Sequence, residues 1–549
     1  MEGSSLAAGF SALEAGRWVD ARAAFESTLA AGDSAEACLG LATALWWLGD
    51  SHASVGHASR AYVLFRAAAN VEGAVQCAVW LGITYKANFA NFAAANGWIG
   101  RAERLLAPFE PGLLHGWICV ARAYRMPDLD AAETLTVRAV ELGRVAGDAD
   151  LELGAMSHLG LIRVGQGRVA EGFALIDEAM AAALAGEGSN LDTVVYTCCD
   201  MLNACELASD LERAAQWCRV ADEFVDNYGC PFLYAECRLY YGSVLLARGR
   251  WDDADRELSA GLRITAGASP GLHARALTRL ARLRVRQGRL EDAAQILSGV
   301  DVDSEAEAML SLAAMLIARG DAQAASRQLE ERLQHVAAHR FHLATALDLL
   351  IDASLGNGDV ETAGTAADRL SDVVVGGAQS QQLTALAASA RGRVLIAQGA
   401  TEAAATELYS AVAQLSRLEL PFELAHAHYD LGRALVDTSR DAATGHLRLS
   451  LACFEDLGAA LDADRVAAFL RSLGVSARTG AKGVGRLTDR EQQVLRLLSA
   501  GLSNPEIAQR LHVSRKTAAH HVSHILTKLN LRNRAEIVAF AMRESTEHH

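Results

Sequence analysis

A short unit recurs along this chain and limits its possible folds more than any other feature. Each copy has a turn of Gly and polar residues, then an amphipathic stretch with Ala at its crowded positions, then a second Leu-rich stretch. Copies begin at Gly16, Gly167, Gly249, Gly288, Gly320, Gly358 and Gly399, and the last five lie 39, 32, 38 and 41 residues apart. Gly at each turn supplies the positive φ of a helix C-cap. The repetition predicts stacked helix pairs, each burying its apolar face against its neighbours.

Composition favours an all-α fold, because aromatic residues make up only 6% of the chain and Pro occurs seven times. The recurring unit resembles degenerate tetratricopeptide repeats, whose period is about 34 residues. The resemblance extends over most of residues 1–470, although the period blurs between about Ser51 and Asp150. It implies a helical solenoid whose concave surface binds a peptide, a protein or a small-molecule effector. A purely structural spacer is the alternative interpretation.

Charge is distributed unevenly along the chain. From Arg478 to His549 there are twelve Lys or Arg and six Asp or Glu, so this segment carries +6 while the remainder of the chain carries −21. Such an asymmetry indicates a tail that faces nucleic acid on an acidic body. The first residues, MEGSSLAAGF, contain no basic leader, and no apolar run reaches membrane-spanning length. We therefore expect a cytoplasmic protein with no membrane partner.

Cysteine and histidine do not follow a metal-binding or redox spacing in the repeat region. The ten Cys include no CxxC pair, and the adjacent Cys198 and Cys199 lie in helical sequence. We expect small buried core residues, since free Cys is among the most buried residue types. His426 and His428 lie two positions apart and do not share a helix face, which argues against a metal pair.

The segment from Gly474 to Arg486, GVSARTGAKGVGR, is rich in Gly, Ser and basic residues and has no apolar periodicity. This composition is typical of a flexible linker. The chain is therefore expected to contain a helical repeat array at residues 1–473, a linker at 474–486 and a separate C-terminal domain at 487–549.

Four helices are expected between Leu487 and Met542, because each candidate helix has its own start signal. Three capping boxes pair an N-cap residue with a Glu three positions later: Thr488 with Glu491, Ser503 with Glu506, and Asn533 with Glu536. Ser514 caps the third helix. Pro505 falls in the first turn of the second helix, where its missing N–H costs nothing.

The third of these helices has two chemically different faces. One face is an apolar stripe of Ala518, Val522, Ile525 and Leu529, which should pack on Val494, Leu495, Leu498, Ile507 and Leu511. The opposite face carries Lys516, Ala519, His520, Ser523 and Thr527. A helix packed on one side and polar on the other fits the major groove of DNA. The positive charge that phosphates require would come from Arg490, Arg515, Lys516, Lys528, Arg532 and Arg534.

Residues Leu487 to Met542 resemble the DNA-binding domain of LuxR-type regulators. The motifs LTxRE, SNxEIAxxL, VSxKT and HVxxIxxKL are all present between Leu487 and Leu529. The resemblance implies a helix-turn-helix whose base contacts fall on Ala519, His520 and Ser523. Phosphate contacts would fall on Lys516, Thr517 and Lys528, with Arg515 beside them. The resemblance also implies a homodimer on double-stranded DNA, paired through the fourth helix, Arg534 to Met542. Ala518, where the family usually has Val, predicts slightly looser packing of the third helix.

Motifs for catalysis are absent from the sequence. It contains no GxxxxGK[ST] phosphate loop, no nucleophile elbow and no dinucleotide fingerprint. His520, His521 and His524 are neighbours, but no Cys or carboxylate shares their turn, so a metal site is not expected. We expect a transcriptional regulator without enzyme activity or cofactor, in which the repeat array is a sensory or partner-binding module. The alternative is a repeat-based protein-interaction scaffold with accessory DNA binding.

Overall fold

The computed structural model describes residues 2–124, 126, 128–208, 210–267, 269–302, 306–336, 340–375 and 380–477, and in the tail residues 494, 495, 497, 498, 502–511, 522, 525 and 536. Every regular element in these residues is an α-helix, and no strand occurs among them. The predicted all-α class is confirmed. The helices group into two compact units, Met1–His446 and Leu447–His549.

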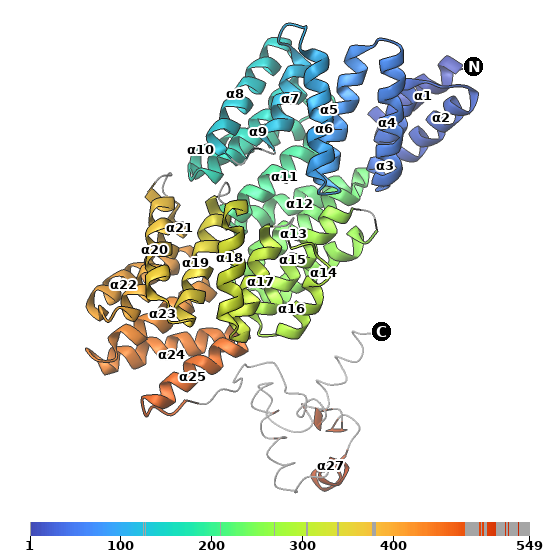
Figure 1. The fold of residues 1–549 in the computed structure, drawn as a ribbon. Helices are drawn as coiled ribbons and strands as arrows, with labels where there is room; N and C mark the ends of the chain where they lie inside the picture. Colours follow the sequence, from blue (N-terminus) through green and yellow to red (C-terminus); the bar gives the residue numbers. More distant parts are fainter. Residues whose placement is uncertain are drawn as a thin grey trace. The chain divides into compact units, whose positions relative to one another are not determined.

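The helices follow one another along the chain with short connections (Figure 1). The first eight are α1 (Glu2–Glu14), α2 (Trp18–Ala31), α3 (Ala35–Trp47), α4 (Ser51–Ala67), α5 (Val71–Ala87), α6 (Phe92–Leu106), α7 (Leu113–Ala123) and α8 (Leu129–Ala146). The next eight are α9 (Ala149–Gly165), α10 (Val169–Leu184), α11 (Leu191–Ala208), α12 (Leu211–Tyr228), α13 (Pro231–Ala247), α14 (Trp251–Thr265), α15 (Pro270–Arg286) and α16 (Leu290–Leu297). The remainder are α17 (Ala306–Arg319), α18 (Ala322–Val336), α19 (Arg340–Gly356), α20 (Val360–Val375), α21 (Gln381–Ala397), α22 (Thr401–Leu418), α23 (Pro421–Leu435), α24 (Arg440–Leu457), α25 (Ala460–Ser472) and α27 (Asn504–Arg510).

The turn glycines that mark the repeats all have left-handed backbone. The seven glycines that begin the sequence units have φ between 67° and 89°. At the end of α15, Gly288 N–H donates to the Val285 carbonyl at 2.9 Å and Arg289 N–H donates to the Arg284 carbonyl at 2.8 Å. These two bonds form a Schellman motif, which satisfies the last carbonyls of the helix. The predicted role of Gly in the repeat turns is confirmed.

Helix pairs continue through residues 51–150, where the sequence period blurs. Two turns in this stretch use Ala instead of Gly: Ala69 has φ 55° before α5, and Ala90 has φ 51° before α6. Asn70 and Asn91 then cap the next helices by accepting from the N–H groups of Gly73 and Ala94. Because Ala rarely adopts left-handed backbone, these turns carry no Gly signal, and the repeats are harder to detect in the sequence.

The array has an inner and an outer set of helices. Odd-numbered helices contact the next odd-numbered helix from α5 to α23, and no two even-numbered helices among those described pack to a similar extent. The inner helix α9 buries 13 of its 17 residues. The outer helix α12 buries only a stripe, Ala214, Cys218, Ala221 and Phe224. This alternation of fully buried and one-sided helices is that of a tetratricopeptide-like solenoid.

Glycine permits a close helix crossing between α9 and α10. A Cβ on Gly160 would lie 2.5 Å from Ile176 Cγ1 and 2.6 Å from the Gly172 carbonyl oxygen. A Cβ on Gly172 would lie 2.5 Å from the Gly160 carbonyl oxygen. Neither position has room for a side chain, so the two backbones meet directly.

Two distant parts of the array are joined by hydrogen bonds at Asn88, which follows α5. The Asn88 carbonyl accepts from Gly271 N–H at 2.9 Å, although the two residues are far apart in sequence. The Asn88 amide nitrogen donates to Ser51 Oγ at 2.9 Å and to Ser269 Oγ at 3.2 Å, and its oxygen accepts from Trp46 Nε1 at 3.3 Å. Asn88 is only 1% exposed. The end of α5 is therefore joined to the start of α15.

Tryptophans join the first helices to the middle of the array. The Trp18 and Trp47 rings stack with centroids 4.2 Å apart. Trp47 Nε1 donates to Asp192 Oδ1 at 2.9 Å, and Trp18 Nε1 donates to the Tyr228 carbonyl. Each indole thus buries its apolar ring and still satisfies its N–H.

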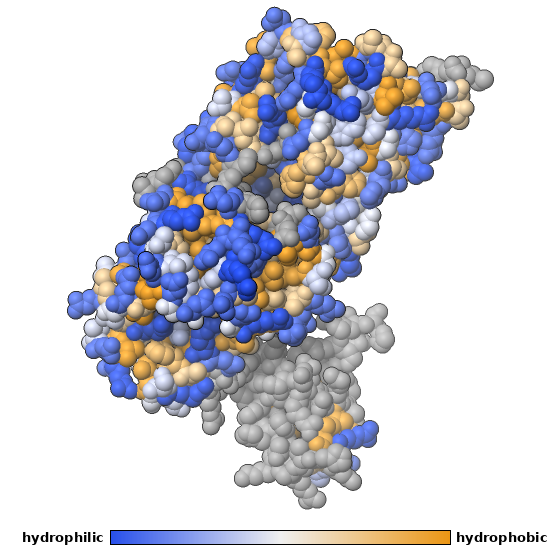
Figure 2. Space-filling model, viewed as in Figure 1, coloured by the Kyte–Doolittle hydropathy of each residue, from blue (hydrophilic) through white to orange (hydrophobic). Residues whose placement is uncertain are grey.

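The visible face of the repeat region is a mixture of hydrophilic and hydrophobic residues, as Figure 2 shows. Exposed large apolar residues such as Val19, Val63 and Val145 are spread over several helices. In the described part of the chain, no helix combines the length and the apolar character needed to cross a membrane.

Candidate functional site

The C-terminal segment forms a small apolar core of its own. Val494, Leu498, Ile507, Ala508, Val522 and Ile525 are buried together, with Leu495, Leu497, Leu502 and Leu511 packed around them. Val522 and Ile525 belong to the apolar stripe expected from the sequence, and the residues expected to receive that stripe are present in this cluster. For these described residues the predicted packing is confirmed.

The start of α27 has the Glu506 half of the capping box predicted from Ser503 and Glu506. The Glu506 carboxylate reaches back and accepts from Ser503 N–H at 2.7 Å and from Ser503 Oγ at 2.6 Å. Pro505 lies in the first turn of the helix. A negative side chain at this end also suits the helix dipole.

The residues predicted to contact DNA lie outside the described residues. They are Arg515, Lys516, Thr517, Ala519, His520, Ser523 and Lys528. The same holds for His521 and His524, for Ala518 and Leu529 of the apolar stripe, and for the fourth helix except Glu536. Their roles therefore stay predictions.

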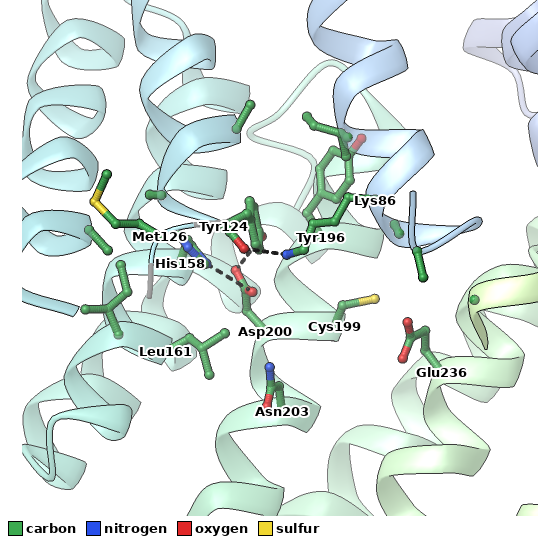
Figure 3. A pocket seen from close by; sticks show the side chains of 18 of the residues that line it. Lys86, Tyr124, Met126, His158, Leu161, Tyr196, Cys199, Asp200, Asn203 and Glu236 are labelled. Atoms are coloured by element: carbon green, nitrogen blue, oxygen red, sulfur yellow. Dashed lines mark hydrogen bonds and ion pairs between the residues drawn. The ribbon is translucent and has the colours of Figure 1, made fainter. Parts of the chain in front are cut away.

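A second candidate site is a cavity of about 370 Å³ inside the first unit (Figure 3). Its walls come from helices between α3 and α19, so it is assembled from residues as distant as Trp46 and Phe341. Known small-molecule sites have volumes of about 300–1,000 Å³. The closure of α5 on α15 at Asn88 contributes to its wall, because Asn88 and Gly271 both line the cavity.

One side of the cavity carries a hydrogen-bonded cluster around Asp200. Tyr124 Oη donates to Asp200 Oδ2 at 2.9 Å, and His158 Nδ1 lies 3.4 Å from Asp200 Oδ1. The Tyr124 and His158 rings are in contact, with centroids 3.7 Å apart and ring planes tilted by 32°. Lys86 Nζ donates to the Tyr124 carbonyl and lies 5.0 Å from the centroid of its ring (Figure 3). Burial, and then the nearby Asp200 carboxylate, raise the pKa of Tyr124 well above its usual value.

The opposite side of the cavity carries an ion pair between Glu236 of α13 and Arg275 of α15. Glu236 is 4% exposed. Arg275 also donates to Tyr240 Oη at 3.4 Å. Asp192 also lines the cavity, and burial raises its pKa to about 6. The cavity therefore combines aromatic walls with several buried charged groups.

The cysteines have the buried, unpaired character predicted for them. All ten are free, and seven are buried. Burial raises the pKa of Cys77 and Cys230 to about 12, which leaves these thiols protonated and poorly nucleophilic at neutral pH. In the described part of the chain, no group of three or more His, Cys, Asp or Glu side chains is arranged to hold a metal ion.

The two histidines considered as a metal pair point to different partners. The His428 ring stacks on His446 of α24, with the two Nδ1 atoms 3.0 Å apart. The His426 ring lies against Phe422 instead. Burial, followed by repulsion from His446, lowers the pKa of His428 to about 4.

The cavity was not predicted from the sequence, because its residues are separated by up to several repeats. The sequence signal that could have indicated the cavity is a set of acidic residues in otherwise apolar helices, such as Asp192 and Asp200 in α11 and Glu236 in α13. All three are less than 9% exposed. A buried carboxylate is rare unless it has partners, so these positions mark a polar site inside the array.

The C-terminal segment matches a known protein family. Residues 486–541 match the family described as "Bacterial regulatory proteins, luxR family". The nitrate/nitrite response regulator NarL of Escherichia coli (strain K12) is 34% identical over 110 residues, which cover 20% of this chain and 45% of NarL. An HTH-type transcriptional regulator from Mycobacterium bovis is 40% identical over 89 residues, which cover 16% of this chain and 10% of that protein.

A third relative matches a much longer stretch of the chain. The HTH-type transcriptional regulator MalT of Vibrio parahaemolyticus is 26% identical over 327 residues, covering 54% of this chain and 35% of MalT. A match of that length includes part of the repeat region. The chain thus spans between a tenth and less than half of the length of these relatives.

Two solved structures align with most of the chain at low identity. They are the APC/C hetero-tetramer Cut9-Hcn1 (14% identity, TM-score 0.40, 85% of this chain and 96% of that chain) and a Rap protein complexed with competence and sporulation factor (11%, 0.37, 76% and 98%). The solenoid assignment rests on the helix packing described above. The C-terminal segment of this chain, residues 486–541, is a regulatory domain of the bacterial luxR family, and it follows a tetratricopeptide-like helical repeat region.

Proposed function

We propose that the protein is a transcriptional regulator that binds double-stranded DNA through its C-terminal domain and receives a signal through its repeat array. The luxR-family match at residues 486–541 is the observation that carries this proposal. The buried positions Val522 and Ile525 support it, because they are the expected inward-facing residues of a recognition helix. Since the proposed target is DNA, the proposed location is the cytoplasm. No catalytic role is proposed.

The proposed contacts with DNA are those that the resemblance to LuxR-type domains implies, and the burial of Val522 and Ile525 supports them. In a helix that runs through Val522 and Ile525, residues 516, 520 and 523 fall on the opposite side. We assign base contacts to Ala519, His520 and Ser523, where side chains or backbone approach the donors and acceptors of the major groove. Contacts with the phosphate backbone are assigned to Arg515, Lys516, Thr517 and Lys528, which fix the register of the domain on the duplex.

The proposed functional organisation is an array at residues 1–473, a linker at 474–486 and a DNA-binding domain at 487–549. The bound form is proposed to be a homodimer paired through Arg534 to Met542. Ile537, Val538, Phe540 and Ala541 in this segment are more apolar residues than one small core requires. A footprint that covers only a single half-site at saturation would contradict the dimer.

Removal of the C-terminal domain tests the proposed function. Gel-shift and genome-wide immunoprecipitation experiments would compare the full-length protein with a chain that ends at residue 477. The full-length protein should bind a limited set of promoter fragments, and the shortened chain should bind none. Equal binding by both proteins would contradict the proposal. Regulation that survives the truncation would favour the scaffold alternative, in which assembly through the array is the main task.

A further inference from the structure

From the geometry of the cavity in the first unit, we infer that it is a binding site for an uncharged small organic molecule with a ring body and hydroxyl or N–H donors. The inference that this molecule is the signal for the regulator rests on the proposed function. The binding site itself rests on three observations: apolar walls, two unpartnered buried acceptors, and balanced charge.

The apolar walls favour a ligand with a ring or other compact apolar body. Aromatic residues from four different helices line the space: Trp46 of α3, Trp80 of α5, Tyr196 of α11, and Phe232 and Tyr240 of α13. Such walls bury a flat apolar body well and orient it by stacking or edge contacts. The cavity is formed only when distant repeats meet, so its shape depends on the whole closed turn of the array.

His158 presents the first unpartnered acceptor. It is 5% exposed, and its Nδ1 faces Asp200 Oδ1 at 3.4 Å while its Nε2 has no hydrogen-bond partner in the structure. With Nδ1–H donating to Asp200, the neutral imidazole offers Nε2 as an acceptor. A buried acceptor without a partner costs free energy, and a donor group from a ligand would recover it.

Glu236 presents the second unpartnered acceptor. Its Oε1 pairs with Arg275, while its Oε2 is buried and has no hydrogen-bond partner in the structure. His158 lies on α9 and Glu236 on α13, so the acceptors belong to separate walls of the cavity (Figure 3). Two buried acceptors predict a ligand with at least two donor groups.

The charge of the cavity wall argues for an uncharged ligand. Its charged residues are three cations and three anions: Lys86, Arg275 and Arg340 against Asp192, Asp200 and Glu236. The formal charges cancel when all six are ionised. A ligand with a net charge would enter a low-dielectric space that has no surplus opposite charge, which is costly. A neutral donor molecule meets no such cost.

Calorimetric titration of the full-length protein with three probes of similar shape tests the inference. 4,4′-Dihydroxybiphenyl has two hydroxyl donors, 4,4′-dimethoxybiphenyl has none, and 4′-hydroxybiphenyl-4-carboxylate has one donor and a negative charge. The dihydroxy probe should bind at one site per chain and about tenfold or more tightly than either of the others. Equal affinities for the three probes, or no saturable binding of the dihydroxy probe, would overturn the inference.

A substitution at Glu236 locates the bound probe. In Glu236→Gln the amide oxygen should face Arg275, so the amide N–H groups face the cavity and replace an acceptor with donors. Binding of the dihydroxy probe should weaken about tenfold. Glu133→Gln is the matched control, because Glu133 also pairs with arginines, Arg163 and Arg168, but does not line the cavity. Equal weakening by both variants, or by neither, would contradict the assigned site. If Glu236→Gln fails to fold, the three-probe comparison on the unaltered protein still decides the inference.

The outcome for DNA binding is measured separately on the same protein. If the dihydroxy probe binds but leaves DNA affinity unchanged, the cavity is a ligand site and its role as the signal input is wrong. If the protein binds the probe but no DNA, the proposed function fails while the ligand site stands.

Discussion

The two candidate sites of this chain are built in opposite ways. The proposed DNA-contacting residues lie within 14 consecutive positions, from Arg515 to Lys528, whereas the cavity gathers residues from Trp46 to Phe341. A site carried by one short helix leaves a motif in the sequence. A site assembled by the closure of a superhelix leaves only isolated buried polar residues. The comparison shows that a repeat region can contain a candidate binding site that no local sequence pattern indicates.

The largest expected effect separates the stability of the two regions. Ile507 is fully buried in the small core of the C-terminal segment. Ile507→Asp should abolish DNA binding, because an unpaired charge in this core unfolds the domain. The thermal unfolding of the repeat array should remain unchanged. Ile507→Val is the control and should keep DNA binding, since such a change typically costs about 0.5–1.5 kcal/mol. Loss of the array together with the tail would mean that the two regions do not fold independently.

The next prediction concerns the array alone. Gly160→Ala should lower the free energy of unfolding by about 1–3 kcal/mol, because the new Cβ collides with Ile176 and the Gly172 carbonyl. Gly97→Ala is the same substitution in α6 at a position where nothing lies within 4 Å of the new Cβ. It should be neutral or stabilise the protein by up to about 1 kcal/mol. Urea unfolding followed by circular dichroism measures both, and the same sign for the two variants would contradict the crossing geometry.

A third pair of variants separates sequence reading from general attraction in the tail. His520→Ala should weaken binding to the preferred site by roughly 1–3 kcal/mol and leave random DNA nearly unaffected. Lys516→Ala should weaken binding to all sequences alike and reduce the salt slope by about one. Fluorescence anisotropy with both DNAs at several salt concentrations measures the two effects. If His520→Ala weakens both DNAs equally, the assignment of the base-reading face is wrong.

The smallest expected effect is a pH dependence at the end of the array. Because the pKa of His428 is lowered in the folded state to about 4, the folded state binds fewer protons there than the unfolded state. Its contribution to stability is therefore present above about pH 6.5 and lost as the pH falls toward 4. The expected loss is about 1 kcal/mol, after allowance for the partial exposure of the ring.

A variant isolates this contribution from other groups. Asp192 and Asp348 also titrate in this range, since their pKa values are raised to about 6 and their contribution has the opposite sign. The free energy of unfolding should therefore be measured for the unaltered protein and for His428→Asn, each at pH 7 and at pH 5. The variant should lose less stability on acidification, and an identical loss would rule out the histidine pair as a cause.

Sequence reasoning predicted the features that depend on neighbouring residues. The positive φ at Gly288 follows from its place after a helix, and the bond from Ser503 N–H to the Glu506 carboxylate follows from their spacing. The burial of Val522 and Ile525 follows from helical periodicity. Each of these features is determined by residues only a few positions apart, so it can be predicted from the local sequence pattern.

The features that depend on distant contacts were not predicted. The turns at Ala69 and Ala90 adopt left-handed backbone without Gly, and the surrounding helices hold them there. Asn88 looks like an ordinary polar residue at a helix end, yet it joins α5 to α15. The partners of His158 and Glu236 are set by the stacking of several repeats. Only the folded array shows which residues meet there.

The salt dependence of DNA binding by the full-length protein tests the central claim most directly. If the C-terminal domain makes about four to six phosphate contacts, the plot of log affinity against log salt concentration should have a slope near −4 to −5 for each bound subunit, because each contact releases condensed counterions. A slope near zero at all salt concentrations would contradict a domain that holds DNA through Arg515, Lys516 and Lys528.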